Sequence, residues 1–225
     1  IMASFGNVVK LLESYRGRDK IIRTTSFASV MVGGLTSNSQ LSQRLMKISM
    51  ELNGCRMILR LFDDLSMLAV SMGYGLGKKA IWRENDTIQR IFKLMSNFVN
   101  QMFFPIEHIA WAADKGLISI SSAPWALASL CTWISSLLIN IMRFGEFVVG
   151  NNQMKYIFSR SSKLDSKTFK SSLKTEALNF VENASNLGMA VHWLPGQQLW
   201  CGRLSPAVVG ALGVTSSAIG LIKLT

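Results

Sequence analysis

The sequence is poor in cysteine and proline, and each shortage excludes a class of protein. Three cysteines, Cys55, Cys131 and Cys201, are odd in number, widely separated and set among apolar residues. They argue against a disulfide framework and indicate reduced packing residues of an intracellular protein. Only four prolines are present in 225 residues, and sustained period-two alternation is lacking. A sheet protein is therefore disfavoured, and the chain is predicted to be mostly α-helical.

Acidic residues and charge in general are also scarce. The chain has 13 Asp and Glu against 24 Lys and Arg, and 16% of its residues are charged while 49% are hydrophobic. An apolar body with a basic polar surface is typical of a membrane protein that contacts anionic lipid headgroups. The alternative is a soluble helical nucleic-acid binder, but the basic patch of such a protein normally lies on a conventionally polar domain.

Patterns for catalysis and metal binding are missing. Neither histidine has a second His or Cys at metal-ligand spacing, and no Gly-x-Ser-x-Gly nucleophile motif is present. Asp63 and Asp64 resemble an acid/base pair, but neighbouring helical residues diverge by about 100°. The two carboxylates are expected to balance Arg56 and Arg60 on adjacent turns. The sequence predicts no enzyme, no metal site and no cofactor.

One segment has a regular heptad pattern that predicts a helix. Its apolar seam, in steps of four and three, is Leu41, Leu45, Ile48, Leu52, Cys55, Leu59 and Phe62. A second stripe, almost opposite, is Met46, Met50, Met57 and Leu61. The helix could be buried in a protein core. It could also lie in the headgroup region of a membrane, with the Leu, Ile, Phe and Met side chains of both stripes inserted.

Basic residues accompany this helix and an earlier charged motif, ESYRGRDKIIR (13–23). The predicted headgroup contacts are Arg44, Lys47, Arg56 and Arg60 in the heptad helix and Arg16, Lys20 and Arg23 in the charged motif. The last three form one helical stripe, and Asp19 is expected to pair locally with Arg16 or Arg23. The alternative for the motif is an ordinary solvated helix surface.

A third amphipathic pattern follows between residues 88 and 103. Its apolar face comprises Ile88, Ile91, Phe92, Met95, Phe98, Val99, Met102 and Phe103, and its other face is polar and nearly uncharged. Packing of this apolar face against another helix is the favoured interpretation.

Two uncharged runs are long enough to suggest membrane spans. The first extends from Trp125 to Met142, with Pro124 before it and Arg143 after it, and nearly covers a hydrocarbon core of ~30 Å. The second extends from Leu204 to Ile222. Its small residues predict close helix contact and self-association of the chain, through Ala207, Ala211, Gly213, Ser217 and Gly220. Buried helices of a soluble bundle are the alternative for both runs.

The predicted fold class is all-α, with amphipathic N-terminal helices followed by two hydrophobic, membrane-spanning helices. Four segments follow from this reading. Residues 2–123 form an amphipathic membrane-remodelling region, and residues 124–149 contain the first transmembrane helix. Residues 150–203 form a basic loop and an amphipathic helix, and residues 204–223 contain the second transmembrane helix.

Four motifs in order carry a resemblance that covers essentially the whole chain. ESYRGRDKIIR, CRMILRLFDDL (55–65), EHIAWAAD (107–114) and HWLP (192–195) resemble the peroxin-11 family of peroxisomal membrane proteins, and the gamma-type branch fits best. The resemblance implies a multi-pass protein of the peroxisomal membrane with both termini in the cytosol. It further implies an amphipathic helix, matched by residues 41–62, that curves and elongates the membrane and so promotes peroxisome proliferation and fission.

The resemblance also implies partners. These are an anionic phospholipid membrane, further copies of the chain and other peroxin-11 family members, fission adaptors with a dynamin-like GTPase, and the import receptor for peroxisomal membrane proteins; nucleic acid is not among them. An alternative function is a pore for small metabolites, lined by Ser135, Ser136, Asn140, Thr215 and Ser216 of the two runs. The family topology places residues 150–200 on the matrix side, whereas their basic excess favours the cytosolic side.

Overall fold

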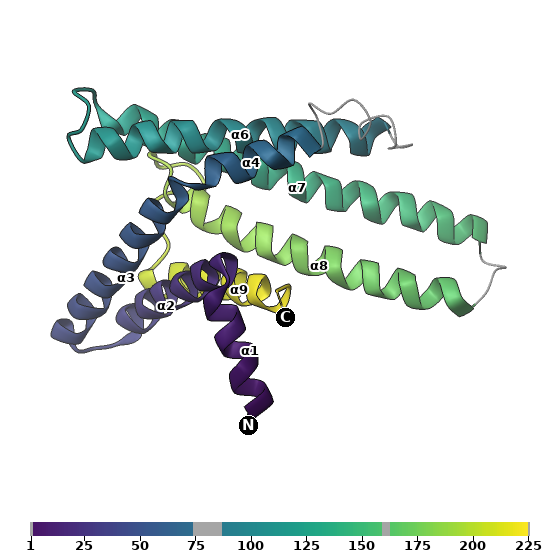
Figure 1. The fold of residues 1–225 in the computed structure, drawn as a ribbon, viewed down its shortest axis with the longest axis horizontal. Helices are drawn as coiled ribbons and strands as arrows, with labels where there is room; N and C mark the ends of the chain where they lie inside the picture. Colours follow the sequence, from purple (N-terminus) through teal and green to yellow (C-terminus); the bar gives the residue numbers. More distant parts are fainter. Residues whose placement is uncertain (1, 74–86, 159–162, 225) are drawn as a thin grey trace. The chain divides into compact units, whose positions relative to one another are not determined.

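A computed structural model describes residues 2–73, 87–158 and 163–224. Its helices are α1 (Met2–Glu13), α2 (Tyr15–Leu35), α3 (Ser39–Arg60), α4 (Asp63–Gly73), α6 (Thr87–Asp114), α7 (Ser122–Phe158), α8 (Lys163–His192) and α9 (Pro206–Ile222) (Figure 1). The chain folds as two units. Unit 1 comprises residues 1–63 together with 185–225, and unit 2 comprises residues 64–184.

The predicted all-α fold is confirmed over the described residues, which contain no strand. Within them, the segment Ser122–Val148 of α7 is long and apolar enough to cross a membrane, whereas α9 is a shorter apolar helix of 17 residues. The basic loop expected from residue 150 differs from the structure, because residues 150–158 and 163–174 are helical. Residues 159–162 of that loop lie outside the described residues. The four-segment division by membrane disposition stays a prediction.

Side-chain caps place several helix starts where the sequence has Ser or Asn. Ser14 accepts a hydrogen bond from the Gly17 backbone N–H at 3.0 Å and so begins α2. Asn38 does the same for Leu41 and begins α3. Ser205 begins α9. Such caps satisfy backbone donors that a helix leaves unpaired at its first turn.

In unit 1, α2 lies between α3 and α9 and runs antiparallel to both. Along α3, Tyr15 meets Leu59 and Ser26 meets Ser49. Along α9, a methyl group on Gly34 would collide with Ala207, and one on Gly220 would collide with Lys20. Helix α2, near the start of the chain, and α9, the last helix described, thus pack in one unit, which the linear order of the motifs does not reveal.

The interior of unit 1 combines a small apolar cluster with small polar residues. Phe27, Met189 and Val209 form the cluster, and Met189 comes from the last turns of α8. Around it the buried polar residues are mostly serines, and Ser26 and Ser216 have no exposed surface. Small side chains of this kind let helix backbones approach closely, an arrangement common between membrane helices.

In unit 2, α6 and α7 pack side by side as an antiparallel pair (Figure 1). A Schellman motif ends α6: Leu117 N–H donates to Ala112 C=O and Gly116 N–H donates to Ala113 C=O. Gly116 has φ +69°, a backbone conformation that favours glycine. The chain therefore turns sharply after α6 and returns along it as α7.

Candidate membrane interface

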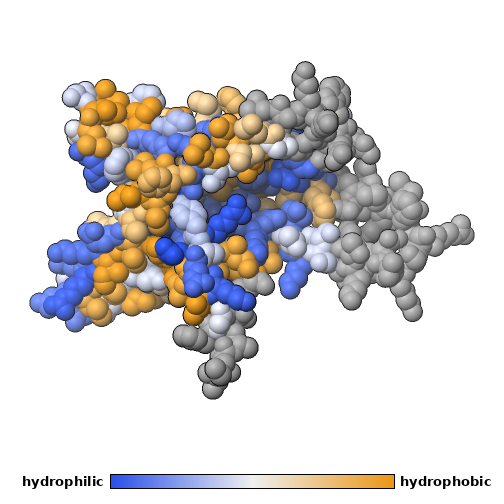
Figure 2. Space-filling view, in the orientation of Figure 1, coloured by the Kyte–Doolittle hydropathy of each residue, from blue (hydrophilic) through white to orange (hydrophobic). Residues whose placement is uncertain are grey.

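Large apolar side chains are exposed along α3, while its contact with α2 is made of small and polar groups. Phe62, just past the end of α3, is 76% exposed and Met50 is 64% exposed; Leu41, Ile48 and Ile58 are exposed as well. Figure 2 shows hydrophobic residues alternating with hydrophilic ones on the visible surface. A helix whose buried residue is Ser49 and which presents Ile and Met side chains outward is suited to contact something apolar other than the chain itself.

The residues predicted to insert into the membrane therefore divide into two groups. Leu41, Ile48, Met50 and Phe62 are exposed, whereas Leu45, Met46, Leu52, Met57 and Leu59 are half-buried. The two predicted stripes flank the α2 contact on either side, since Leu45 and Met46 both lie beside Gly33 of α2. The helix is neither a fully buried core element nor an isolated surface helix.

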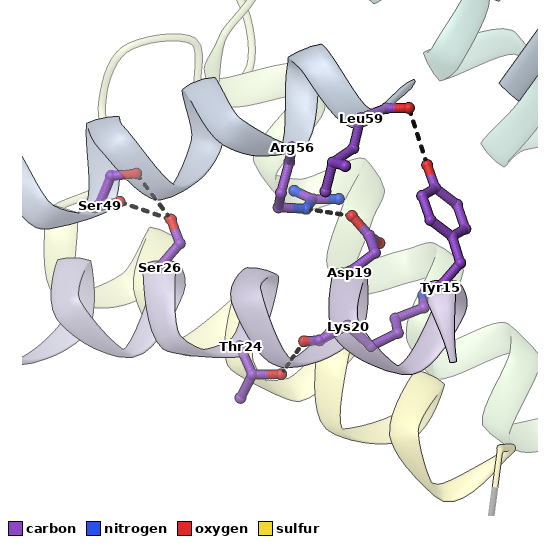
Figure 3. Close-up of polar contacts among 8 residues, drawn as sticks. All are labelled: Tyr15, Asp19, Lys20, Thr24, Ser26, Ser49, Arg56 and Leu59. Carbon is purple, nitrogen blue, oxygen red and sulfur yellow. Dashed lines mark hydrogen bonds and ion pairs between the residues drawn. The ribbon is translucent and has the colours of Figure 1, made fainter. Parts of the chain in front are cut away.

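Polar contacts attach α3 to α2 along their whole common length (Figure 3). The side chains of Ser26 and Ser49 are hydrogen-bonded to each other at 2.9 Å, and both residues are buried. The Arg56 Nε donates to the Asp19 carboxylate at 2.8 Å. Near the other end, Ser42 Oγ donates to the Gly33 carbonyl at 2.7 Å. Together these bonds fix the rotation of α3 about its axis and hence which residues point outward.

The Asp19–Arg56 ion pair bears on two expectations from the sequence. The side chain of Arg56 is 12% exposed, so this residue, predicted to contact lipid headgroups, is held inside unit 1. Asp19 was expected to pair within its own helix and reaches α3 instead. Arg56 pairs with Asp19 and not with Asp63 or Asp64. Asp64 pairs with His108 of α6 at 3.1 Å, and the carboxylate of Asp63 lies near Tyr15.

Tyr15 joins the start of α2 to the end of α3. Its hydroxyl donates to the Leu59 carbonyl at 3.1 Å (Figure 3). Burial, the Asp63 carboxylate and Asp19, in that order, together raise the pKa of Tyr15 to about 12, and Arg60 opposes this shift. Arg60, predicted to contact headgroups, thus lies close to this cluster. The phenol stays neutral and a donor throughout the physiological pH range.

The other predicted headgroup residues also differ in their access to a membrane. Arg44 and Lys47 of α3 and Arg16 of α2 are exposed. Arg23 is half-buried, donates to Asn186 Oδ1 at 2.6 Å and lies over the Phe27 ring at 5.5 Å. Lys20 is half-buried and lies against Gly220 of α9. The basic stripe of the charged motif therefore belongs mainly to the helix packing of unit 1.

The small residues predicted as a contact between copies are used within the chain. A methyl group on Gly213 would collide with the Phe27 ring, and one on Gly220 would collide with Lys20. Ser217 is fully buried, and Ala207 lies against Gly34 of α2. Ala211 is exposed. The close helix contact that the spacing predicted is present, but its partner is α2 of the same chain.

Comparison with known proteins identifies the chain. It matches the family described as peroxisomal biogenesis factor 11 (PEX11) over residues 5–225. The chain belongs to the PEX11 family. Peroxisomal membrane protein 11C of Homo sapiens is 35% identical over 234 residues, which cover 99% of this chain and 95% of the relative. The Mus musculus protein of the same name is 34% identical over 228 residues, covering 97% and 93%. No solved structure matches the chain.

Membership of the PEX11 family confirms the resemblance read from the four motifs. It makes the chain a peroxisomal membrane protein without enzymatic activity and with a role in peroxisome biogenesis. Two of those motifs contact each other. Tyr15 and Asp19 of ESYRGRDKIIR bond to Leu59 and Arg56 of CRMILRLFDDL. Sequence reasoning quoted both motifs but did not pair them.

A signal for this pairing is present in the PEX11 sequence. Tyr15, Asp19 and Ser26 recur on one face of a helix, and Ser49, Arg56 and Leu59 do so on another. Two short helices joined by a three-residue turn, 36–38, are favoured as antiparallel neighbours. Aligning the faces in that orientation brings Asp19 opposite Arg56. Asn186, which accepts from both Arg23 and Ser216, lay too far along the chain for such an alignment.

Proposed function

We propose that this PEX11-family protein bends and elongates the peroxisomal membrane by inserting the exposed flanks of α3 into the lipid headgroup region. The carrying observation is the exposure of Leu41, Ile48, Met50 and Phe62 beside a buried serine contact. Fully burying one such side chain contributes about 1.5–3 kcal/mol. Insertion from one side enlarges one leaflet relative to the other, which favours curvature.

Charge on the outer face of α3 supports the same placement. Arg44 and Lys47 are exposed there, and each basic residue near an anionic surface contributes about 1 kcal/mol. The contacts between α3 and α2 hold these side chains and the apolar flanks in fixed positions. In this mechanism unit 1 presents a preformed wedge, and α2 connects it to α9, the second predicted span.

In this proposal α7 spans the membrane, the chain is multi-pass and both termini lie in the cytosol. In the apolar window of this helix 17% of the residues are buried, and Leu127, Leu138 and Met142 are exposed and available to lipid. Self-association, binding to other PEX11-family members, recruitment of fission adaptors with a dynamin-like GTPase and delivery by the import receptor are further predictions from the family.

The polar residues that were expected to line a metabolite pore make no contact that favours this function. Of the polar residues expected to line it, Ser136 donates to Asn100 and Ser216 donates to Asn186. Ser135 and Thr215 donate to carbonyls of their own helices. The Ser136 and Ser216 hydroxyls thus join helices, and those of Ser135 and Thr215 bond within their own helices, so membrane shaping is the function that the geometry favours.

The proposed function is tested with the full chain reconstituted into anionic liposomes. We expect the Arg44→Gln, Lys47→Gln double variant to lose most liposome elongation, seen by electron microscopy, because about 2 kcal/mol of headgroup attraction is removed. The matched control, Gln40→Ala with Gln43→Ala, changes two exposed residues at the same end of α3 without changing charge and should elongate liposomes normally. Equal elongation by the double variant and the wild type would disprove the headgroup role.

A further inference from the structure

α6 presents a continuous apolar stripe to the outside. Ile88, Ile91, Met95, Phe98 and Met102 follow one another in steps of three and four. Phe98 is 67% exposed, and the other four are between 42% and 51% exposed. The sequence predicted that this face packs against another helix. The structure divides that face: Phe92, Val99 and Phe103 are half-buried on the side of the buried residues Ser96 and Ala110, whereas the five residues of the stripe are exposed.

The inward face of α6 satisfies its polar groups within the protein. Ser136 of α7 donates to Asn100 Oδ1 at 2.8 Å, and Asn100 Nδ2 donates to Ser96 Oγ at 3.3 Å. Ser71 of α4 donates to Gln101 at 3.2 Å. Polar side chains paired inside and apolar side chains outside are what a hydrocarbon environment requires, because water is absent there as a partner.

The register of the antiparallel α6–α7 pair places part of α6 beside the apolar run of α7. The Asn100–Ser136 bond and the tight turn after Ala112 align residues 94–113 with residues 123–142. Within 94–113 the one formally charged residue is Glu107, seven residues before the end of α6. At ~1.5 Å per residue, Glu107 lies about 10 Å from that end. With 28 residues, α6 is long enough to cross a core of ~30 Å.

We propose that α6 is a membrane-embedded helix whose apolar stripe contacts the lipid hydrocarbon, so that α6 and α7 cross the bilayer together as an antiparallel hairpin. The proposal rests on the spanning of α7 proposed above. Lipid is the occupant of the stripe because the register of the Asn100–Ser136 bond places exposed Phe98 of α6 level with exposed Leu138 in the apolar segment of α7. The Asp114–Lys115 ion pair, 3.0 Å long and exposed, lies at the turn and thus in the opposite headgroup region.

This arrangement has a consequence for topology. Because α6 and α7 together cross the membrane twice, both termini lie in the cytosol, as proposed above, only if α9 does not cross as well; with 17 residues, α9 is shorter than the apolar segment of α7. The start of α6 and the end of the apolar part of α7 lie on the same side of the membrane. The basic segment after residue 150 then begins on the side from which α6 enters, together with Arg90 and Lys93 of α6. Two crossings in succession place these positive charges on one side, which agrees with the positive-inside tendency.

Fluorescence quenching in liposomes tests the contact with lipid. In a full chain with its three cysteines replaced by serine, single cysteines at Phe98 (Phe98→Cys) or Met102 (Met102→Cys) carry a bimane label. We expect lipids with a nitroxide at mid-chain to quench both labels as strongly as a label at Leu138 (Leu138→Cys) on α7, and aqueous iodide to quench them several-fold less than a label at Lys115 (Lys115→Cys).

The outcomes separate this inference from the proposed function. If the Leu138 label is quenched by mid-chain nitroxide and both α6 labels are not, α6 is covered by protein or water and the hairpin is wrong, while α7 still spans. If none of the three is quenched, the proposed spanning of α7 fails as well.

A second readout uses a membrane-impermeant maleimide on intact organelles. Thr87→Cys and Glu146→Cys should react from one side and Lys115→Cys from the other; reaction of Thr87→Cys and Glu146→Cys from opposite sides would overturn the hairpin.

Discussion

The Asp19–Arg56 ion pair is predicted to fix α3 on α2, and its removal should loosen unit 1 selectively. Both side chains are mostly buried, at 21% and 12% exposed. A hydrogen bond between charged groups contributes about 1.5–3 kcal/mol, and leaving a fully buried charge unpaired costs about 3–5 kcal/mol. Because solvent still reaches Asp19 and Arg56 in part, we expect Asp19→Leu to destabilise unit 1 by about 2 kcal/mol.

The assay is a double-mutant cycle on the detergent-solubilised chain. Asp19→Leu, Arg56→Met and the double variant are compared by thermal unfolding, followed by proteolysis at sites in unit 1. For a unit of roughly 100 residues, 2 kcal/mol lowers Tm by on the order of 10 °C. The double variant should recover part of that loss, because neither charge is left buried alone. Additivity of the two single effects within about 0.5 kcal/mol would show that the pair contributes no coupling and would refute this reasoning.

Two further predictions concern unit 1. Gly213→Leu should destabilise the α2–α9 contact by about 1–3 kcal/mol and make unit 1 protease-sensitive, since the new side chain would collide with Phe27. The control Ala211→Leu, on the exposed side of α9, should have neither effect. If Gly213→Leu instead abolished crosslinked oligomers without reducing protease resistance, Gly213 would lie between copies of the chain. Tyr15 has its pKa raised to about 12, so its neutral form stabilises the fold fully below pH 10, and that contribution is lost as pH rises from 10 to 12. In a chain whose other tyrosines are replaced by phenylalanine, ultraviolet titration should show this pKa falling toward 10 on Asp63→Asn, and an unchanged titration would exclude Asp63 as a cause.

The features predicted well from the sequence are those that depend on neighbouring residues. The heptad pattern from Leu41 to Phe62 placed α3 within two residues of its ends, because helix periodicity is local. The uncharged run after Pro124 gave the long apolar helix for the same reason. The small residues of 204–222 correctly indicated close helix packing, but spacing alone does not say which helix supplies the other surface.

The features predicted poorly depend on partners distant in the chain. Arg56 was expected to contact headgroups because it lies at the edge of the apolar seam of its helix; its partner, Asp19, is 37 residues away. The apolar face of residues 88–103 was expected inside, since in water such a face is buried. The same pattern also suits a helix with polar contacts inside and lipid outside, so a single sequence cannot decide between the two.

The packing of α2 against α9 also constrains the order in which the protein can assemble. About 170 residues separate the end of α2 from the start of α9, so the contact is highly non-local, and such contacts form late. During synthesis α2 and α3 emerge long before the helix that covers Phe27 and Gly34. A fragment that ends before Pro206 therefore leaves Phe27, Met31 and Gly34 of α2 uncovered, and its behaviour on membranes describes an incomplete unit rather than the mature one.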